Sequence, residues 1–285
     1  MDIFSVKNIQ PMLIAEDKPA FDDPDFIFEL KLDGVRALAY LSPEGIELRN
    51  KRNKRLNAIY PELINTYHQV KTRCILDGEI AVIKNVAPDF FEVQRRSLMT
   101  NPVKIVLAAK KLPVSFTAFD ILYRGSEELT NMILIERKAI LAEEVDETPL
   151  LNMSRFIERD GTALYDAAQS RGLEGIVAKL KDSKYYPGRR TKDWIKCKNM
   201  FDEDFVVCGY YIGEKNTASI VLGAYMDGEL IYQSHVSLGV SRHDFDVRAK
   251  QKNSEGHPGC PDDVGAVWIV PELVSRVQYM ERTPG

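Results

Sequence analysis

The stretch Glu29-Leu30-Lys31-Leu32-Asp33-Gly34-Val35-Arg36 places a lysine between carboxylates, next to a glycine and an arginine. The apolar residues 26–28 before it predict the start of a strand, and alternation would set the lysine and both carboxylates on one face. Gly34 predicts a turn, because glycine adopts turn conformations at little cost. These residues alone fit either a solvated surface hairpin or a catalytic corner, so the choice depends on the rest of the chain.

The composition is that of a globular protein. The chain has 285 residues, of which 45% are hydrophobic and 28% charged, so it is long enough for two domains and a substantial core. A formal charge of -4 argues against a generally basic protein that coats nucleic acid, but it allows a local basic track. Because no apolar run is long enough to cross a bilayer, we expect no membrane partner.

The four cysteines, Cys74, Cys197, Cys208 and Cys260, are scattered and form no Cys-x-x-Cys pair. This spacing argues against a zinc site built from closely spaced thiolates. It favours a reducing compartment, and we expect a cytoplasmic monomer that has no structural disulfides.

A strongly cationic run, Arg49-Asn50-Lys51-Arg52-Asn53-Lys54-Arg55, follows a predicted hairpin whose turn is Ser42-Pro43-Glu44-Gly45. Such a charge run usually forms a solvated face. The alternative is a loop that contacts phosphates, because clustered lysine and arginine side chains supply the sequence-independent part of nucleic-acid affinity. Residues 61–67 then predict a helix with Pro61 in its first turn.

Two glutamates open apolar strands. Residues 74–83 predict a strand pair in which Asp77-Gly78 forms the tight turn, so we interpret this aspartate as structural. Glu79 begins the largely apolar strand that follows, and a carboxylate there calls for a partner such as a metal ion or a ribose. Glu174 similarly opens the strand predicted at residues 173–181.

The middle of the chain mixes helices and strands. Amphipathic helices are predicted at residues 89–111, 133–141 and 162–168. Within the first of these, residues 103–111 also fit a strand. Residues 114–123 predict a strand that contains Phe119, which is either a core residue or a platform on which a base stacks.

Two lysines share one face of a late strand. Residues 193–198 predict a strand in which a period of two places Trp194, Lys196 and Lys198 together. Two lysines on one face repel each other unless an anion lies between them. The pattern therefore indicates phosphate binding.

The sequence pattern changes near residue 202. Beyond it, glycine and aspartate turns separate short predicted strands at residues 205–211, 218–225, 229–236 and 267–269. Such spacing predicts a small antiparallel barrel or sandwich. We therefore expect one domain at residues 1–202 and a second at residues 203–285.

Several of these stretches occur in an order that resembles one family. Lys31-Leu32-Asp33-Gly34-Val35-Arg36 is similar to the KxDGxR motif of covalent nucleotidyltransferases, which include the ATP-dependent DNA ligases and their RNA-ligase and capping-enzyme relatives. The later motifs of the ligases resemble, in sequence order, Asp77-Gly78-Glu79, Phe119-Asp120-Ile121-Leu122-Tyr123, Glu136-Arg137-Lys138, Glu174-Gly175-Ile176-Val177-Ala178-Lys179 and Trp194-Ile195-Lys196-Cys197-Lys198. The resemblance covers nearly the whole chain.

The resemblance implies an α+β fold and an enzymatic activity. The expected fold is an adenylation domain of packed antiparallel sheets with flanking helices, followed by an OB barrel. The expected enzyme is an ATP-dependent DNA ligase that seals breaks in nicked duplex DNA. It would use ATP and Mg²⁺ and pass through a lysyl-AMP intermediate and an adenylated 5′-phosphate.

The resemblance also implies roles for individual residues. Lys31 would attack the α-phosphorus of ATP, assisted by the cations Lys196 and Lys198. The residues expected to bind ATP are Glu29, Lys31, Arg36, Lys51, Arg52, Glu79, Phe119, Glu174, Lys196 and Lys198. Within this set, Glu79 and Glu174 would hold Mg²⁺, and Phe119 would stack on adenine. The basic residues expected to contact DNA are Arg49, Lys54, Arg55, Arg189 and Arg190.

Two departures from the ligase pattern stand out. Where the family usually has Ser-Arg-Asn, this chain has Asn50-Lys51-Arg52, so either Lys51 replaces the arginine or Arg52 shifts into its place. The difference matters because only arginine makes bidentate phosphate contacts. The family's final basic motif would follow Gly285, and we expect a longer C-terminus to raise the rate of Lys31 adenylation.

Two alternatives to a DNA ligase remain open. One is an RNA ligase or a capping-type nucleotidyltransferase, which nucleotide preference would distinguish. The other is a non-catalytic nucleic-acid-binding module with the same fold. Pro11-Met12-Leu13 resembles the opening of many DNA-ligase catalytic domains and favours DNA, whereas intact Lys31, Glu79 and Glu174 argue against a non-catalytic module.

Overall fold

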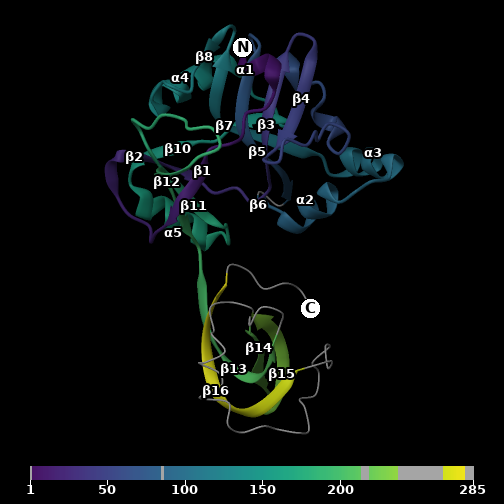
Figure 1. Ribbon diagram of the computed structural model, residues 1–285, viewed down its shortest axis with the longest axis vertical. Helices are drawn as coiled ribbons and strands as arrows, with labels where there is room; N and C mark the ends of the chain where they lie inside the picture. The colour runs from purple at the N-terminus through teal and green to yellow at the C-terminus, as the bar shows by residue number, and fades with distance from the viewer. Residues whose placement is uncertain (1, 85–86, 213–217, 237–265, 280–285) are drawn as a thin grey trace. The chain divides into compact units, whose positions relative to one another are not determined.

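The chain folds into two units, Met1–Asn199 and Met200–Gly285, and each is described by itself. The structure is a computed structural model that describes residues 2–84, 87–212, 218–236 and 266–279. Sheets dominate both units, and helices lie around the sheets of the first (Figure 1). Among the described residues, Cys74, Cys197 and Cys208 are buried and form no disulfide, and Cys260 lies outside the described residues.

Two sheets form the first unit. The five-stranded sheet has the order β1 (Leu13–Asp17), β12 (Arg190–Lys198), β11 (Gly175–Leu180), β2 (Asp23–Leu30) and β10 (Phe156–Arg159). The seven-stranded sheet has the order β4 (Gly45–Asn50), β3 (Val35–Ser42), β5 (Cys74–Lys84), β7 (Val114–Arg124) and β8 (Glu127–Glu128), with β6 (Ala87–Pro88) on β5 and β9 (Leu151–Met153) on β7. The parallel pairs β1/β12 and β7/β9 depart from the antiparallel arrangement that the resemblance implied.

The described helices are α1 (Ile3–Val6), α2 (Phe90–Ser97), α3 (Pro102–Lys111), α4 (Leu134–Glu144) and α5 (Gly161–Ser170), with the 3₁₀ helices η1 (Pro61–Leu63) and η2 (Thr66–Gln69). The strand alternative for residues 103–111 is wrong. The side chain of Asn101 accepts hydrogen bonds from the N–H groups of Val103 and Lys104, and Pro102 suits the first helical position. The continuous helix expected at residues 61–67 is also wrong, because η1 and η2 replace it.

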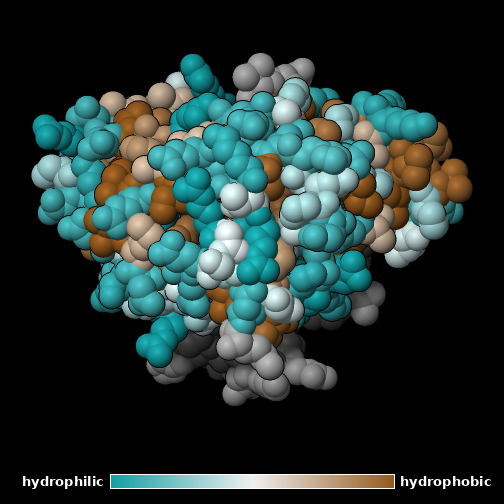
Figure 2. Space-filling model, turned by 90° about the horizontal axis from the view of Figure 1, so that it is seen from above, coloured by the Kyte–Doolittle hydropathy of each residue, from teal (hydrophilic) through white to brown (hydrophobic). Residues whose placement is uncertain are grey.

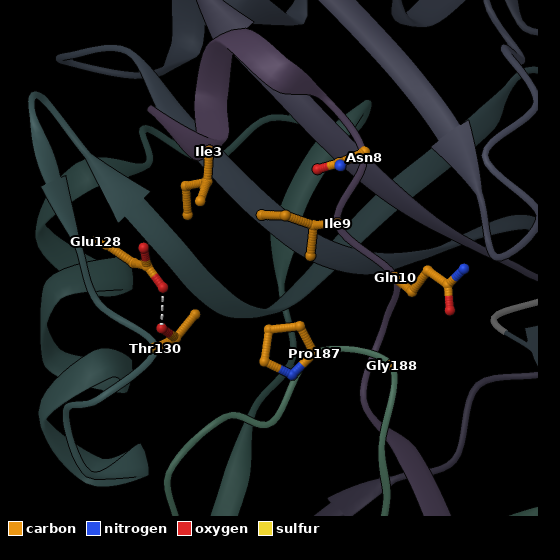
Figure 3. Close-up of a pocket in the computed structure, with 8 residues that line it drawn as sticks. All are labelled: Ile3, Asn8, Ile9, Gln10, Glu128, Thr130, Pro187 and Gly188. Atoms are coloured by element: carbon orange, nitrogen blue, oxygen red, sulfur yellow. Dashed lines mark hydrogen bonds between the residues drawn. The ribbon is translucent and has the colours of Figure 1, made fainter. Parts of the chain in front are cut away.

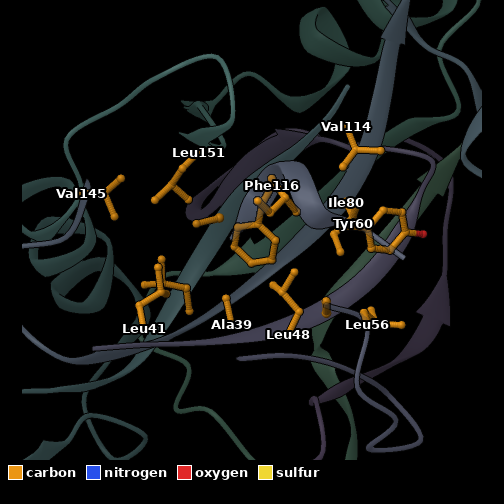
Figure 4. Packing of buried hydrophobic residues seen from close by; sticks show 14 of the residues in the cluster. Ala39, Leu41, Leu48, Leu56, Tyr60, Ile80, Val114, Phe116, Val145 and Leu151 are labelled. Atoms are coloured by element: carbon orange, nitrogen blue, oxygen red, sulfur yellow. The ribbon is translucent and has the colours of Figure 1, made fainter. Parts of the chain in front are cut away.

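Strand β3 is buried on both faces, and two cores therefore meet at it. One core packs the seven-stranded sheet against the helices and includes Ala39, Leu41, Leu48, Ile80 and Phe116 (Figure 4). The other core packs β3 against the five-stranded sheet and includes Ile27, Leu38, Tyr40, Ile75 and Trp194. Because successive side chains of β3 point to opposite faces, they pack into both cores and hold the two sheets of the first unit together.

Strand β5 corrects the interpretation of Asp77-Gly78 as a tight turn. β5 runs without a break and pairs with both β3 and β7, with register shifts against β7 on either side of Leu76-Asp77. A Cβ on Gly78 would lie 2.5 Å from Cζ of Phe116. Glycine is needed there because the Phe116 ring packs directly on the strand, not because the chain turns.

The second unit contains a four-stranded antiparallel sheet. Its order is β15 (Glu229–Val236), β14 (Ala218–Met226), β13 (Phe201–Ile212) and β16 (Val267–Tyr279). β13 shifts register against both β14 and β16 between Val207 and Gly209, and such bulges increase the twist of a strand. Figure 1 shows the sheet as strongly curled.

The surface carries both polar and apolar regions. Hydrophilic side chains cover most of the face in Figure 2, and hydrophobic atoms gather at its right-hand end, where Figure 1 draws α3. Val103 and Leu107 of this helix are 68% and 62% exposed. Among the described residues, no helix is both long and apolar enough to span a membrane.

Candidate active site

A cavity of about 370 Å³ opens in the first unit between strands of its two sheets. Its lining is Leu13, Ile14, Glu29, Leu30, Lys31, Leu32, Arg36, Lys51, Glu79, Phe119, Ser154, Val177, Lys179, Arg190, Trp194 and Lys196. Six of these side chains are lysine or arginine, and two are aromatic. A site with this lining can pair with phosphates and stack on a planar ring.

Lys31 enters the cavity immediately after β2. The strand ends at Leu30, so Lys31 does not continue the alternation expected along Glu29, Lys31 and Asp33. Its backbone N–H donates to the carbonyl of Gly175 (2.9 Å), and its Nζ donates to Oε2 of Glu174 (2.6 Å). Glu174 does not line the cavity, but it holds the amine that does.

Glycine lets this corner lie against β5. A Cβ on Gly34 would approach the carbonyl oxygen of Ile80 to 2.3 Å, a distance that no side-chain carbon tolerates. Residue 34 therefore has to be glycine if residues 31–34 are to stay beside Glu79. This close approach is the physical reason for the glycine in the motif.

Glu29 is buried between two lysines. Its carboxylate lies 2.6 Å from Nζ of Lys138 and 3.1 Å from Nζ of Lys179. Burial alone would raise the pKa of Glu29, but the two positive charges lower it below its ordinary value. Glu29 therefore presents an ionised carboxylate to the cavity.

Arg36 is fixed by Asp77, which is structural as expected but lies within β5 and not in a tight turn. Two nitrogens of Arg36 donate to Asp77, at 3.1 and 2.6 Å, and the hydroxyl of Tyr185 donates to the same carboxylate at 2.6 Å. Burial alone would lower the pKa of Arg36, but the charge of Asp77 raises it. Asp77 thus orients a permanent cation in the wall of the cavity, 5.2 Å from the ring centroid of Phe119.

Lys179 and Trp194 also line the cavity, although neither was expected to bind the nucleotide. Nζ of Lys179 lies 4.4 Å from the ring centroid of Phe119 and 4.3 Å from that of Trp194. Burial lowers the pKa of Lys179 to about 8, although the charge of Glu29 opposes this shift. A lysine inside an otherwise apolar strand was the signal that could have identified it.

Glu79 also faces the cavity. Burial raises the pKa of this carboxyl to about 8, although the charges of Arg36 and Lys31 oppose the shift. Among the described residues, none forms a hydrogen bond or an ion pair with it. A half-buried carboxyl that lacks such a partner is suited to a ligand that carries positive charge or donates hydrogen bonds.

The two lysines of β12 are held by one carboxylate. Nζ of Lys196 lies 3.5 Å from Oδ1 of Asp17, and Nζ of Lys198 lies 3.6 Å from Oδ2. An anion between the lysines is what their spacing required, and in this structure a side chain of β1 supplies it. Lys196 lines the cavity, whereas Lys198 does not.

The cationic run after β4 divides between the cavity and the surface. Lys51 lines the cavity, whereas Arg52 and Lys54 are exposed and do not. Arg49 and Arg55 pair with Glu47. Of the two other basic residues expected to contact DNA, Arg189 is exposed, whereas Arg190 lines the cavity and donates to the carbonyl of Ile14 (2.6 Å).

A magnesium ion in this cavity would have few protein ligands. Within residues 2–84, 87–212, 218–236 and 266–279, no three His, Cys, Asp or Glu residues cluster as a metal site. Mg²⁺ usually binds one or two carboxylates and takes its other ligands from substrate phosphates and water. Glu79 fits such a site, and Glu174 can contribute if its bond to Lys31 is released.

A second cavity, of about 320 Å³, has a different character (Figure 3). Its lining includes Ile3, Ile9 and Pro187, and the hydroxyl of Thr130 donates to its one carboxylate, that of Glu128. None of its lining residues in the described chain is a lysine or an arginine. The cations that can bind a polyphosphate therefore lie in the first cavity.

Comparisons with known proteins point to one family. The profile described as "ATP dependent DNA ligase domain" matches residues 11–198. The multifunctional non-homologous end joining DNA repair protein LigD of Mycobacterium tuberculosis is 28% identical over 297 aligned positions, covering 99% of this chain and 37% of LigD. The chain thus spans just over a third of that relative's length.

Another relative and a solved structure agree. DNA ligase C1 of Mycolicibacterium smegmatis is 31% identical over 240 residues, covering 81% of this chain and 68% of that protein. The crystal structure of the ligase domain of M. tuberculosis LigD has 26% identity and a TM-score of 0.61, and it covers 98% of this chain and 91% of that one. A mycobacterial DNA ligase D complexed with ATP and MES aligns with a TM-score of 0.60 at 26% identity, with the same coverage of both chains.

Proposed function

This chain belongs to the ATP-dependent DNA ligase domain family, and on that premise we propose that it seals breaks in duplex DNA through an adenylate carried by Lys31. It has the nucleotidyltransferase-type ligase fold, in which sheets predominate. Ligases of this family use ATP and Mg²⁺ and act through a covalent enzyme adenylate. Because the chain spans 37% of LigD, its own substrate is part of the proposal.

The observation that carries the proposal is the setting of Lys31. Its Nζ lies in a cavity with five further cations and with Phe119, and Glu174 holds it at 2.6 Å. The ammonium form cannot attack phosphorus, so the amine must lose its proton. In the free protein, Glu174 pairs with Nζ of Lys31. Binding of a polyphosphate beside the amine would then rearrange this pair.

The reaction proposed for Lys31 has three steps. First, Nζ of Lys31 attacks the α-phosphorus of ATP, an N–P bond forms, and pyrophosphate leaves. Second, a 5′-phosphate oxygen at the break attacks the same phosphorus, and the N–P bond to Lys31 breaks. Third, the 3′-hydroxyl attacks the 5′-phosphorus and AMP leaves. Much of the rate would come from positioning and charge neutralisation.

Other side chains in and beside the cavity would position the nucleotide. Phe119 would stack on adenine, and Glu29 would lie near the base and ribose. The phosphates would contact Lys31, Arg36, Lys51, Lys196 and Lys198. Since Lys51 lines the cavity and Arg52 does not, we assign Lys51 to the position that the family gives to arginine. Glu79 and Glu174 would hold Mg²⁺, which lowers the electrostatic cost of bringing phosphates together.

The DNA contacts and the second unit complete the proposal. Lys54 and Arg189 are exposed and available to the phosphate backbone, as are Arg49 and Arg55 once they release Glu47. We propose that Arg190 orients the nucleotide rather than DNA, because it lines the cavity.

Residues 203–285 would form an OB barrel, with the curled sheet of β13–β16 as its described part. The protein would act as a cytoplasmic monomer.

Sealing of a nicked duplex tests this function. The protein is incubated with ATP, Mg²⁺ and a nick that has a 5′-phosphate, and joined strands are separated on a denaturing gel. We expect joining that a 5′-hydroxyl nick does not support and that Lys31→Ala abolishes. A preference for GTP would indicate a capping-type enzyme instead of a DNA ligase, and a preference for nicks in RNA would indicate an RNA ligase. No joining and no enzyme labelling would favour a binding module.

A further inference from the structure

Asp17 lies where a phosphate is expected to bind. It is the last residue of β1, and it pairs in parallel register with Lys196 of β12. Two residues further along the same strand, Lys198 has its side chain on the same face. The Asp17 carboxylate therefore contacts both lysines, one with each oxygen, at 3.5 and 3.6 Å.

An irregularity in the strand pair creates this contact. Ile14 lies opposite Thr191, but Glu16 lies opposite Ile195, so two extra residues of β12 are accommodated between them. With regular pairing from Ile14, Asp17 would lie opposite Trp194 instead. The bulge therefore places the Asp17 carboxylate beside Lys196 and Lys198.

The contact is open enough to be exchanged. The side chain of Asp17 is 56% exposed, and those of Lys196 and Lys198 are each 27% exposed. Ion pairs of this kind are weak and screened by solvent. The pair between Arg36 and Asp77 differs, because the Asp77 carboxylate is fully buried and accepts two hydrogen bonds from the guanidinium. Of these two pairs, the one at Asp17 can open without leaving a charge buried.

We propose that Asp17 is an internal competitor for the phosphate site formed by Lys196 and Lys198, and that it weakens the binding of ATP. The inference rests on the proposed function, in which these lysines contact the nucleotide. In the free protein the carboxylate offsets part of the positive charge of the two lysines. A bound phosphate takes its place, and Asp17 turns into solvent. The carboxylate remains nearby as a like charge that opposes the phosphate.

The test compares Asp17→Asn with Glu16→Gln in the full chain. The neighbouring Glu16 pairs with Lys18 and Lys192, so its substitution removes a carboxylate of β1 without touching the proposed site. The rate of Lys31 labelling is measured against ATP concentration. For Asp17→Asn we expect KM for ATP to fall about two- to fivefold with little change in kcat, and the gain to shrink at high salt. Glu16→Gln should leave KM unchanged.

An unchanged or raised KM in Asp17→Asn would overturn the inference, and a raised value would mean that Asp17 positions the lysines. Thermal unfolding checks that the Asp17→Asn variant is folded. If it is not, Asp17→Ser takes its place under the same criteria. The proposed function fails in a different way: wild-type protein would then take no label at any ATP concentration. The two failures are therefore distinguishable.

Discussion

Glu79 differs from the other carboxylates that act in the cavity, because no described residue forms an ion pair or a hydrogen bond with it. Glu29 is held by two lysines, and Glu174 holds Lys31. The pKa of Glu79 is raised to about 8 by burial, so this carboxyl is mostly neutral at pH 7 in the free protein. An unfolded glutamate titrates near pH 4.3.

This difference predicts how Glu79 affects stability. Between about pH 4.5 and 8 the folded protein keeps a proton on Glu79 that the unfolded chain has lost, so stability falls as the pH rises through this window. We expect Glu79→Gln to remove this loss. Its midpoint temperature should exceed that of the wild type by about 2–4 °C or more at pH 8.5, and by less at pH 5.

Glu44→Gln is the matched control for this measurement. Glu44 lies in the exposed turn between β3 and β4, and a hydrogen bond with Ser42 lowers its pKa, so it does not titrate between pH 5 and 8.5. Its substitution should shift the midpoint equally at both pH values. A pH-independent difference between Glu79→Gln and the wild type would contradict the account of Glu79.

At the scale of residues, short patterns singled out Lys31 but not the contacts of the side chains around it. Residues 29–36 identified Lys31, and an aromatic residue within a strand suggested Phe119. The position of Asp77 within a strand was missed because its partner Arg36 lies 41 positions away, and an Asp-Gly pair is compatible with a local turn. The contacts of Lys179 were also hidden, since its neighbours belong to other strands.

At the scale of elements, one buried ion pair ties α4 to β7. Two nitrogens of Arg137 donate to Asp120 at 2.8 Å each, and both side chains are fully buried. Arg137 also donates to the carbonyls of Met132 and Ser183. These contacts join the helix to the sheet and to the segment after β11.

Removing Asp120 should therefore be costly. Asp120→Ala leaves the guanidinium of Arg137 buried without a counter-charge, and we expect the free energy of unfolding to fall by about 3–5 kcal/mol. Glu143→Gln is the control, because it removes a 67% exposed partner of Arg124 and should cost less than about 1 kcal/mol. Denaturant unfolding measures both. Equal, small losses would show that the buried pair does not stabilise the fold.

The sequence predicted the presence of helices and strands better than their boundaries. α3 was ambiguous because its β-branched valines fit a strand, while Asn101 and Pro102 specify a helix start. The continuity of β5 could not be inferred, because Gly78 serves a contact with Phe116 that only the folded sheet creates. Local turn statistics and tertiary packing gave opposite answers there, and packing determined the fold.

At the scale of the molecule, the whole lining of the candidate site comes from the first unit. We therefore expect residues 1–199 alone to bind ATP but not to seal nicks. Of the two tryptophans of the chain, this fragment retains only Trp194, whose ring lies 6.0 Å from that of Phe119. The fluorescence of Trp194 should change as ATP is added, and the fragment should bind ATP with an affinity similar to that of the whole chain.

The corresponding controls are Lys196→Ala in the same fragment, which should bind ATP more weakly, and sealing assays with the fragment and the whole chain. A fragment that folds but gives no fluorescence change would contradict the placement of the nucleotide. The family was recognisable from ordered motifs, whereas the strand order of the second unit depends on long-range strand pairing that local patterns do not encode.

Covalent labelling of Lys31 is the most direct test of the central claim. The protein is incubated with ATP labelled at the α-phosphate and with Mg²⁺, denatured, and digested, and the labelled peptide is identified. We predict label on the peptide that contains Lys31, lost when pyrophosphate is added before the protein is denatured and absent in Lys31→Ala. Label on another residue, or label that persists in Lys31→Ala, would contradict the account.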